Sequence, residues 1–434
     1  MANCLRDFLT PTLYKQAQAA RTRAGGRRQH PARWQTQPLL LVLVLLTYSC
    51  GDSQDERFQT AQAACILCRH KRRRPGQTLH GFHKALQRMP VAVLRLVAAG
   101  VRRRLQDLLA LVTDGFLVLG CDGSLLECPR SAELEQRLGD RGTQQAASTL
   151  WLTALVHLHS GVLWSWRLGR STASERVHLA HLLKTLPPCA LIVADAGFSG
   201  YGLAQAIVDA GASFLIRASA KDSFYREQAV DRDRWRDGRV LLWPQTAQQK
   251  GQAPLCLRLI RVRARKAKHD VWLLTNILDR RRRPAATASR YYRWRWENEG
   301  FFRTYKRTLA KVKLSSRTLR LVHREAEGAL LGTQLLLAQG ARALSRRRAS
   351  QVPVRCSPRG VLLAIRREMQ AALACRRPSL RQCLQEACRE QRRRRSAKEK
   401  RAWPRRKRHP GSKPPKFLLL SEQQKALQQK VQRE

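Results

Sequence analysis

The sequence predicts an α/β fold in which a mixed β-sheet is flanked by helices. Short apolar runs rich in Val, Leu and Ile alternate with helix-period segments between residues 111 and 218. Two of these runs end in an aspartate, and a basic, helical segment precedes them all. At 434 residues the chain has room for about three domains, and a hydrophobic fraction of 43% supports a folded core.

The N-terminal part, residues 1–110, is expected to be a helical, basic DNA-binding region. Apolar segments with helical spacing alternate there with Arg clusters, and no strand pattern interrupts them. The most apolar run, PLLLVLVLLTYSC at residues 38–50, is far shorter than the ~20 residues of a membrane-spanning helix. It also follows a basic stretch too long for a signal peptide, so we expect a buried helix.

Residues 111–218 are predicted to form the first part of the core. GFLVLGCDGS reads as a buried strand ended by a turn, and residues 148–169 as two strands joined at His159-Ser160-Gly161. A helix, a strand, a second helix and a second strand follow, at residues 172–188, 190–200, 201–211 and 212–219. Three antiparallel strands followed by helix-linked parallel strands indicate a mixed sheet covered by helices.

The rest of the chain is predicted to comprise three further segments. Residues 219–288 form a β-rich insertion, with strand patterns RVLLWPQ, PLCLRLIRVRAR and VWLLTNIL. Residues 289–345 return to the core with a helix at 291–306, followed by a long amphipathic helix or helix pair. Residues 346–434 are Arg-rich, and from Gln391 we expect disorder until the chain meets a polyanion.

The charge balance predicts an anionic partner. Lys and Arg total 83 against 31 Asp and Glu, a net charge of +52 that makes the chain repel itself. Double-stranded DNA is the expected partner, because bound phosphates neutralise the bases and release counterions. An anionic membrane is the alternative, but the Arg-rich runs lack the apolar face of a lipid-binding helix.

The 12 cysteines show no repeating framework, which indicates reduced thiols and a cytoplasmic, nucleoid-associated protein. Cys65 and Cys68 form a lone CxxC with His70 close behind. Without a second CxxC or a spaced His pair, a zinc site there stays an open question.

The stretch YYRWRWENEGFFRTYK, residues 291–306, carries polar side chains in one row. On a continuous helix, Tyr292, Arg295, Glu299 and Lys306 fall within a stripe roughly 60° wide and about 21 Å long. Glu297 falls on another face, so Glu299 is the carboxylate set between cations. The alternative is an ordinary helix with i,i+4 ion pairs, such as Arg295 with Glu299.

Three carboxylates could together bind metal. Asp122 and Asp195 each end a buried strand, where an ionised acid is costly unless it has a task. A turn-forming role is the alternative for either one alone. With Glu299 they make a set able to hold two Mg²⁺ ions, with Mn²⁺ as a substitute, for in-line displacement at phosphorus.

These features together resemble the DDE transposases of the IS4 family, which are built on a ribonuclease H-like core with a β-rich insertion. The family signature is Tyr, two residues, Arg, three residues, Glu, six residues, Lys, and the chain matches all four positions from Tyr292 to Lys306. The surroundings of Asp122 (VLGCDGS) and Asp195 (IVADAGF) resemble those of the family's first two acids.

The resemblance implies roles for individual residues. Asp122, Asp195 and Glu299 would be the catalytic metal ligands, and Tyr292, Arg295 and Lys306 would contact DNA phosphates. Arg217 resembles a DNA-contacting position, with an ordinary surface arginine as the alternative. Trp272 lies near an aromatic that stacks on a flipped base in family members that cut through a hairpin, with a core Trp as the alternative.

The implied activity is cut-and-paste transposition: cleavage at inverted-repeat ends and strand transfer into target DNA by a homodimeric synaptic complex. Two other readings use the same residues. A ribonuclease H-like nuclease would hydrolyse without joining, and an inactive DNA-binding protein derived from a transposase would keep the fold alone.

Overall fold

The computed structural model describes residues 2–24, 34–68, 75–139, 148–229, 231–263, 270–347, 355–373, 385 and 414–433. These residues divide into two compact units. The first comprises Met1–Leu111, Gly123–Ala173 and Glu297–Gln391, and the second Val112–Asp122, Ser174–Trp296 and Arg392–Glu434. The chain thus passes from one unit to the other several times, and we describe each unit by itself.

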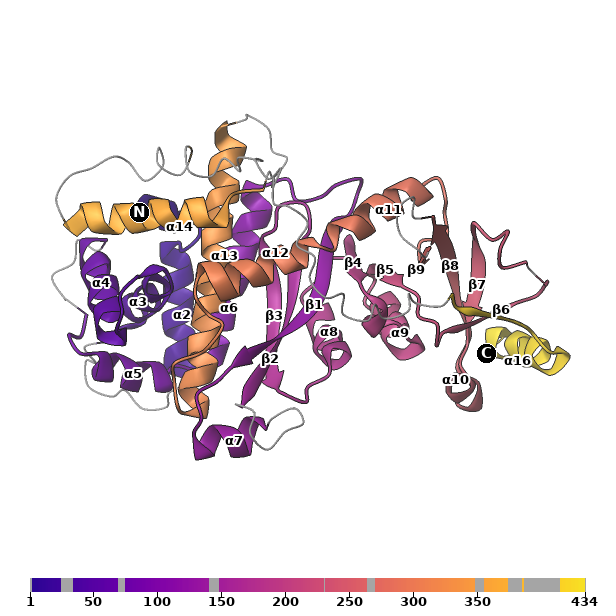
Figure 1. Ribbon diagram of the computed structural model, residues 1–434, viewed down its shortest axis with the longest axis horizontal. Helices are drawn as coiled ribbons and strands as arrows, with labels where there is room; N and C mark the ends of the chain where they lie inside the picture. Colours follow the sequence, from indigo (N-terminus) through magenta and orange to yellow (C-terminus); the bar gives the residue numbers. More distant parts are fainter. Residues whose placement is uncertain are drawn as a thin grey trace, which may run out of the picture. The chain divides into compact units, whose positions relative to one another are not determined.

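The first unit is mainly helical (Figure 1). Its N-terminal helices are α1 (Ala2–Arg6), α2 (Pro11–Ala24), α3 (Thr36–Tyr48), α4 (Gln54–Leu67), α5 (Leu79–Gln87) and α6 (Val91–Leu108). Later segments add α7 (Ala132–Leu138), the strands β2 (Thr149–His157) and β3 (Leu163–Arg170), α12 (Glu297–Arg303), the π-helical η2 (Thr304–Thr308), α13 (Leu319–Arg347) and α14 (Pro358–Leu373). The predicted hairpin is present, because β2 and β3 pair antiparallel.

Helix α3 is the buried helix predicted from the apolar run, and that prediction is confirmed. It packs against α13, a single 29-residue helix, and a Cβ added at Gly328 would lie 2.5 Å from the side chain of Leu43. The missing side chain therefore lets the two helices approach closely. None of the helices in the described ranges is long and apolar enough to cross a membrane.

The second unit is built on a mixed sheet. Its strand order is β10-β6-β7-β8-β9-β5-β4-β1, with β1 (Leu117–Glu127), β4 (Ala190–Ala194), β5 (Ser213–Arg217), β6 (Ser223–Arg226), β7 (Asp237–Leu242), β8 (Leu255–Val262), β9 (Val271–Thr275) and β10 (Lys416–Leu419). Strands β1, β4 and β5 are parallel neighbours, whereas β5, β9, β8, β7 and β6 pair antiparallel in turn. The helical elements are α8 (Glu175–Leu183), η1 (Ala196–Phe198), α9 (Tyr201–Asp209), α10 (Gln245–Gln249), α11 (Ala285–Trp294) and α16 (Glu422–Arg433).

The predicted α/β fold, a mixed sheet with flanking helices, is confirmed. Helix α9 packs on β5, and α11 packs on β4 and β8. The strands predicted for residues 219–288 are present, and β9 pairs with β5. The β-rich segment therefore extends the sheet that carries the two aspartates.

The single helix predicted for residues 291–306 is wrong. Helix α11 ends at Trp294, α12 begins at Glu297, and the chain turns π-helical at Thr304. Arg295 and Trp296 donate their amides to carbonyls three residues back, which closes the helix in a tight turn. The predicted stripe from Tyr292 to Lys306 assumed one continuous helix with ~100° per residue, and this break removes that assumption.

Disorder from Gln391 onwards is also wrong for the end of the chain, while residues 391–413 lie outside the described residues. Strand β10 pairs parallel with β6, and the Phe417 ring lies 5.1 Å from that of Trp235 and 6.0 Å from that of Trp272. Two residues of the apolar run at 417–420 explain the order: Phe417 packs on these rings and Leu420 is buried with Trp243, which the basic composition of the tail as a whole conceals.

Candidate active site

Asp195 directly follows β4, whereas Asp122 lies in the middle of β1. The strand end predicted at Asp122 is therefore wrong, because β1 continues to Glu127. The parallel pairing of β1 with β4 ends with Gly120 and Val193, which lie two residues before Asp122 and Asp195. Adjacent strands are about 4.8 Å apart. Both side chains are half-buried. The parallel pairing therefore brings the two segments that contain the aspartates side by side.

Arg217 continues this row. Ala194 of β4 pairs with Ile216 of β5, so the next position along the register sets Asp195 beside Arg217. In open α/β sheets, ligands bind at the carboxyl ends of parallel strands. Asp195 and Arg217 thus lie at the carboxyl ends of β4 and β5, where a ligand is expected, and Asp122 lies on the neighbouring strand β1.

The carboxylate of Asp195 is held by the turn that it begins. Asp195 caps η1, and its Oδ1 accepts a hydrogen bond from the Gly197 amide at 2.8 Å. Arg176, in the first turn of α8, donates from Nε to the Gly197 carbonyl oxygen at 2.8 Å and from Nη2 to the Ser199 carbonyl oxygen. Ser199 Oγ in turn lies 2.6 Å from Asp222 Oδ2. The turn is therefore pinned on both sides of Gly197.

Sequence reasoning missed Arg176. A base in the first turn of a helix opposes the helix dipole, which favours acids there. Arg176 directly follows Glu175, and a base at this position of α8 was a signal that could have indicated a partner outside the helix.

Cys121 is buried on β1 near several carboxylates. Its side chain is 1% exposed, and burial raises the pKa of the thiol well above its ordinary value. The carboxylates of Glu175, Asp122 and Asp195 raise it further. Because like charges disfavour the thiolate, Cys121 stays protonated near the two aspartates.

Tyr292 and Arg295 come from α11 and its C-terminal cap. Burial raises the pKa of the Tyr292 hydroxyl. The charges of Arg295 and Arg217 lower this pKa and that of Asp195 raises it, so Tyr292 shares the electrostatic environment of Asp195 and Arg217. The Arg295 guanidinium carbon lies 5.7 Å from the centre of the Tyr292 ring. Arg295 Nε is buried, and no hydrogen-bond acceptor among the described residues meets it.

Glu299 and Lys306 lie in the first unit. Glu299 is exposed on α12, and its neighbour Glu297 forms an ion pair with Arg355. Lys306 is half-buried in η2; burial lowers the pKa of its ammonium group, and Glu127 acts in the opposite direction. The broken helix thus divides the signature, with Tyr292 and Arg295 in one unit and Glu299 and Lys306 in the other.

Trp272 is buried, with 6% of its surface exposed. Its ring meets Phe417 edge-on, and the Arg261 guanidinium lies 5.5 Å from its centre. This burial favours the interpretation of Trp272 as a core residue, because stacking on a flipped base requires an exposed ring face.

The donors on the sheet fit a hard divalent cation. Asp122 and Asp195 offer carboxylate oxygens, the ligands that Mg²⁺ prefers, and the Gly197 contact orients one of them. Across the residues that the structure describes, no group of three or more His, Cys, Asp and Glu side chains is arranged to hold a metal. That result also covers Cys65 and Cys68, while His70 lies outside the described ranges.

Comparison with known proteins identifies the family. A family model for the transposase DDE domain matches residues 114–333. The chain is also similar to piggyBac transposase, solved by cryo-EM as a synaptic complex with hairpin DNA, with 11% identity, a TM-score of 0.43, and coverage of 89% of this chain and 85% of that one. No curated protein matches. Because the family model spans more than half of its length, this chain belongs to the transposase DDE domain family.

Proposed function

We propose that this chain is a DNA transposase of the IS4 type, which cleaves the ends of its element and joins them to target DNA. The observation that supports the proposal is the parallel pairing of β1, which contains Asp122, with β4, which ends directly before Asp195, within the domain that the family model matches. Carboxylates on neighbouring strands suit phosphoryl transfer, in which the protein chiefly positions and neutralises charge.

Asp122 and Asp195 would hold Mg²⁺, and Glu299 is the proposed third ligand on the strength of its place in the signature. When bound, the metal makes the attacking water or 3′-hydroxyl more acidic and stabilises the leaving oxygen. Gly197 and Arg176 would keep Asp195 in a fixed orientation for this task.

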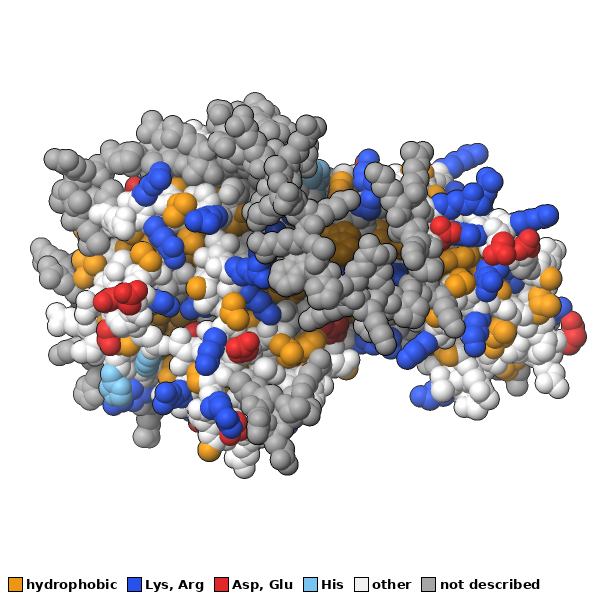
Figure 2. All heavy atoms as spheres, viewed as in Figure 1, with side chains coloured by type: hydrophobic (Ala, Val, Ile, Leu, Met, Phe, Trp, Pro, Cys, Tyr) orange, Lys and Arg blue, Asp and Glu red, His pale blue; other side chains and the backbone are white. Residues whose placement is uncertain are grey.

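The bases around the aspartates would bind the DNA backbone. Arg217 extends the row on the sheet, and Arg295 presents a buried Nε with no acceptor among the residues described. An arginine fork pairs well with phosphate oxygens. Lys and Arg side chains are widely spread over the face of the molecule in Figure 2, and such charge would steer DNA towards the protein. Two copies would act together on two ends of the element.

The proposal is tested by neutral substitutions of the acids. Asp122→Asn, Asp195→Asn and Glu299→Gln should each lower Mg²⁺-dependent cleavage of an inverted-repeat substrate by about 10³-fold or more, with DNA binding retained. Asp209→Asn, at the exposed end of α9, and Glu297→Gln serve as controls and should cleave normally. Unchanged cleavage by the Asp195→Asn variant would contradict the proposed metal site.

A second measurement separates transposase from nuclease. With two pre-cut ends and a supercoiled target plasmid, a transposase yields joined products, because the 3′-hydroxyl of the element is the nucleophile. Hydrolysed ends without joined products indicate the nuclease. Retained binding with no cleavage by the wild-type protein indicates an inactive derivative.

A further inference from the structure

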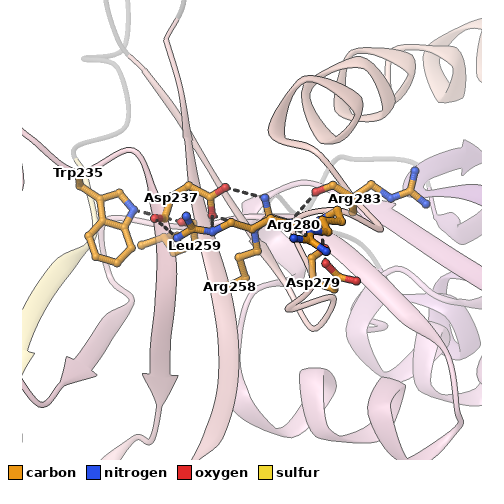
Figure 3. Close-up of polar contacts among 8 residues, drawn as sticks. Trp235, Asp237, Arg258, Leu259, Asp279, Arg280 and Arg283 are labelled. Atoms are coloured by element: carbon orange, nitrogen blue, oxygen red, sulfur yellow. Dashed lines mark hydrogen bonds and ion pairs between the residues drawn. The ribbon is translucent and has the colours of Figure 1, made fainter.

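A buried arginine ties two strands of the β-rich segment together. Arg258 of β8 is 1% exposed, and its guanidinium makes a two-point contact with Asp237 of β7: Nε to Oδ1 at 2.8 Å and Nη2 to Oδ2 at 2.6 Å (Figure 3). A bidentate contact fixes direction as well as distance. Burying a charge is costly, so a buried ion pair is by itself weak evidence for a stabilising role.

The same guanidinium also holds the segment that leads into α11. Arg258 Nη1 donates to the carbonyl oxygen of Arg283 at 2.6 Å, and Arg280 Nη2 donates to the carbonyl oxygen of Asp237 at 2.8 Å (Figure 3). Arg283 directly precedes Pro284, the N-cap of α11. The segment before α11 is therefore attached to β7 and β8 through the side chains of Arg258 and Arg280, and Arg258 alone contacts both Asp237 and Arg283.

The side chain of Arg283 also contacts α11 itself. It is 1% exposed, and its guanidinium carbon lies 4.3 Å from the ring centre of Phe116 and 4.6 Å from that of Tyr291. The Tyr291 hydroxyl donates to Asp114 Oδ2 at 2.5 Å. Since Tyr291 adjoins Tyr292, a shift of Arg283 would turn the helix face that carries Tyr292.

We infer that Arg258 is a positioning residue for DNA cleavage: through Arg283 it sets the place and rotation of α11, and so of Tyr292 and Arg295. The inference rests on the proposed function, because Tyr292 and Arg295 matter only if they bind DNA. Arg258 itself is buried and touches no substrate. Its side chain acts on the reaction only through the helix that it holds.

A double-mutant cycle tests the inference. Arg258→Lys keeps the charge and loses the fork, and it should lower single-turnover cleavage about 10-fold. Because Arg258 is inferred to act through both Tyr292 and Arg295, adding Arg258→Lys to the variant that carries Tyr292→Phe and Arg295→Ala should not slow its cleavage further. Losses that multiply in the combined variant, or unchanged cleavage by Arg258→Lys, overturn the inference.

The matched control lies on the same strand. Arg261 of β8 forms an ion pair with Asp270, at 2.6 Å between Nε and Oδ2, and its contacts lie away from the segment before α11. Any loss in Arg261→Lys should therefore multiply with that of the variant carrying Tyr292→Phe and Arg295→Ala. Hydrogen exchange supplies a second readout: the amides of residues 285–294 should exchange faster in Arg258→Lys and at the wild-type rate in Arg261→Lys.

If Arg258→Lys fails to fold, Asp237→Asn replaces it in the same cycle, since the amide keeps the volume and loses the charge. Asp195→Asn is assayed in parallel on the same substrate. If Asp195→Asn abolishes cleavage while the losses in the cycle multiply, only the positioning role fails. If Asp195→Asn cleaves normally, the proposed function fails with it.

Discussion

Arg176 Nε donates a hydrogen bond to the carbonyl oxygen of Gly197 at 2.8 Å, and the amide of the same glycine donates to Asp195 Oδ1. One peptide segment therefore connects a helix-borne cation to a carboxylate on the sheet. The orientation of Asp195 depends on this relay as well as on its strand.

Removing the relay should weaken the response to metal. A hydrogen bond from a charged group contributes about 1.5–3 kcal/mol, so we expect Arg176→Ala to lower cleavage at limiting Mg²⁺ by about 10- to 100-fold. The loss should shrink as the Mg²⁺ concentration rises, because excess metal compensates for a poorly oriented ligand. Titration of cleavage rate against Mg²⁺ measures this. Arg239→Ala, an exposed arginine on β7, is the control, and an unshifted Mg²⁺ dependence for Arg176→Ala would contradict the relay.

Cys121 should resist alkylation in the folded protein. The thiolate is the reactive form, and both burial and the neighbouring carboxylates keep the pKa of this thiol well above its ordinary value. Native protein treated with iodoacetamide at pH 8 and analysed by peptide mass spectrometry should carry the label at the exposed Cys50 and Cys256 first. Denaturation should expose Cys121 to the reagent. Equal labelling of Cys121 and Cys256 in the native protein would argue against a buried, acidic surrounding.

His157 should make the protein sensitive to mild acid. It is buried, with Nδ1 2.7 Å from Ser160 Oγ and Nε2 2.9 Å from the Leu111 carbonyl oxygen, and burial lowers its pKa from 6.5 to about 4. The unfolded chain takes up a proton below pH 6.5 while the folded one does so only near pH 4. Unfolding is therefore favoured increasingly between these values, by roughly 3 kcal/mol at the lower limit.

Urea unfolding at pH 7 and pH 5 checks this expectation. The fall in midpoint between the two pH values should be smaller in His157→Gln than in the wild-type protein. His80→Gln, which changes an exposed histidine, should behave as wild type. Equal falls in all three proteins would exclude His157 as the source.

The strands β1 and β4 were predictable because their signals are local, although β1 runs through Asp122 to Glu127 where a turn was expected. Apolar runs such as ALIVA need burial wherever they lie, and Asp195 follows directly where the run stops. The pairings that bring the segments of Asp122, Asp195 and Arg217 side by side were not predictable, since they join segments far apart in the chain. Arg176 was missed for the same reason, because its carbonyl partners lie beyond α8 and β4.

The break after Trp294 shows the limit of periodicity. Spacing alone put Tyr292 and Glu299 on one helix face, but tight turns at Arg295 and Trp296 end α11 and separate the signature into two units. Composition likewise concealed β10, whose four residues are ordered by pairing with β6. The order of residues along the chain thus establishes the chemistry available to this transposase, because burial preference, turn formation and charge belong to each segment. Which groups face one another was settled only on folding, since strand pairing and helix termination depend on contacts between segments that no local pattern records.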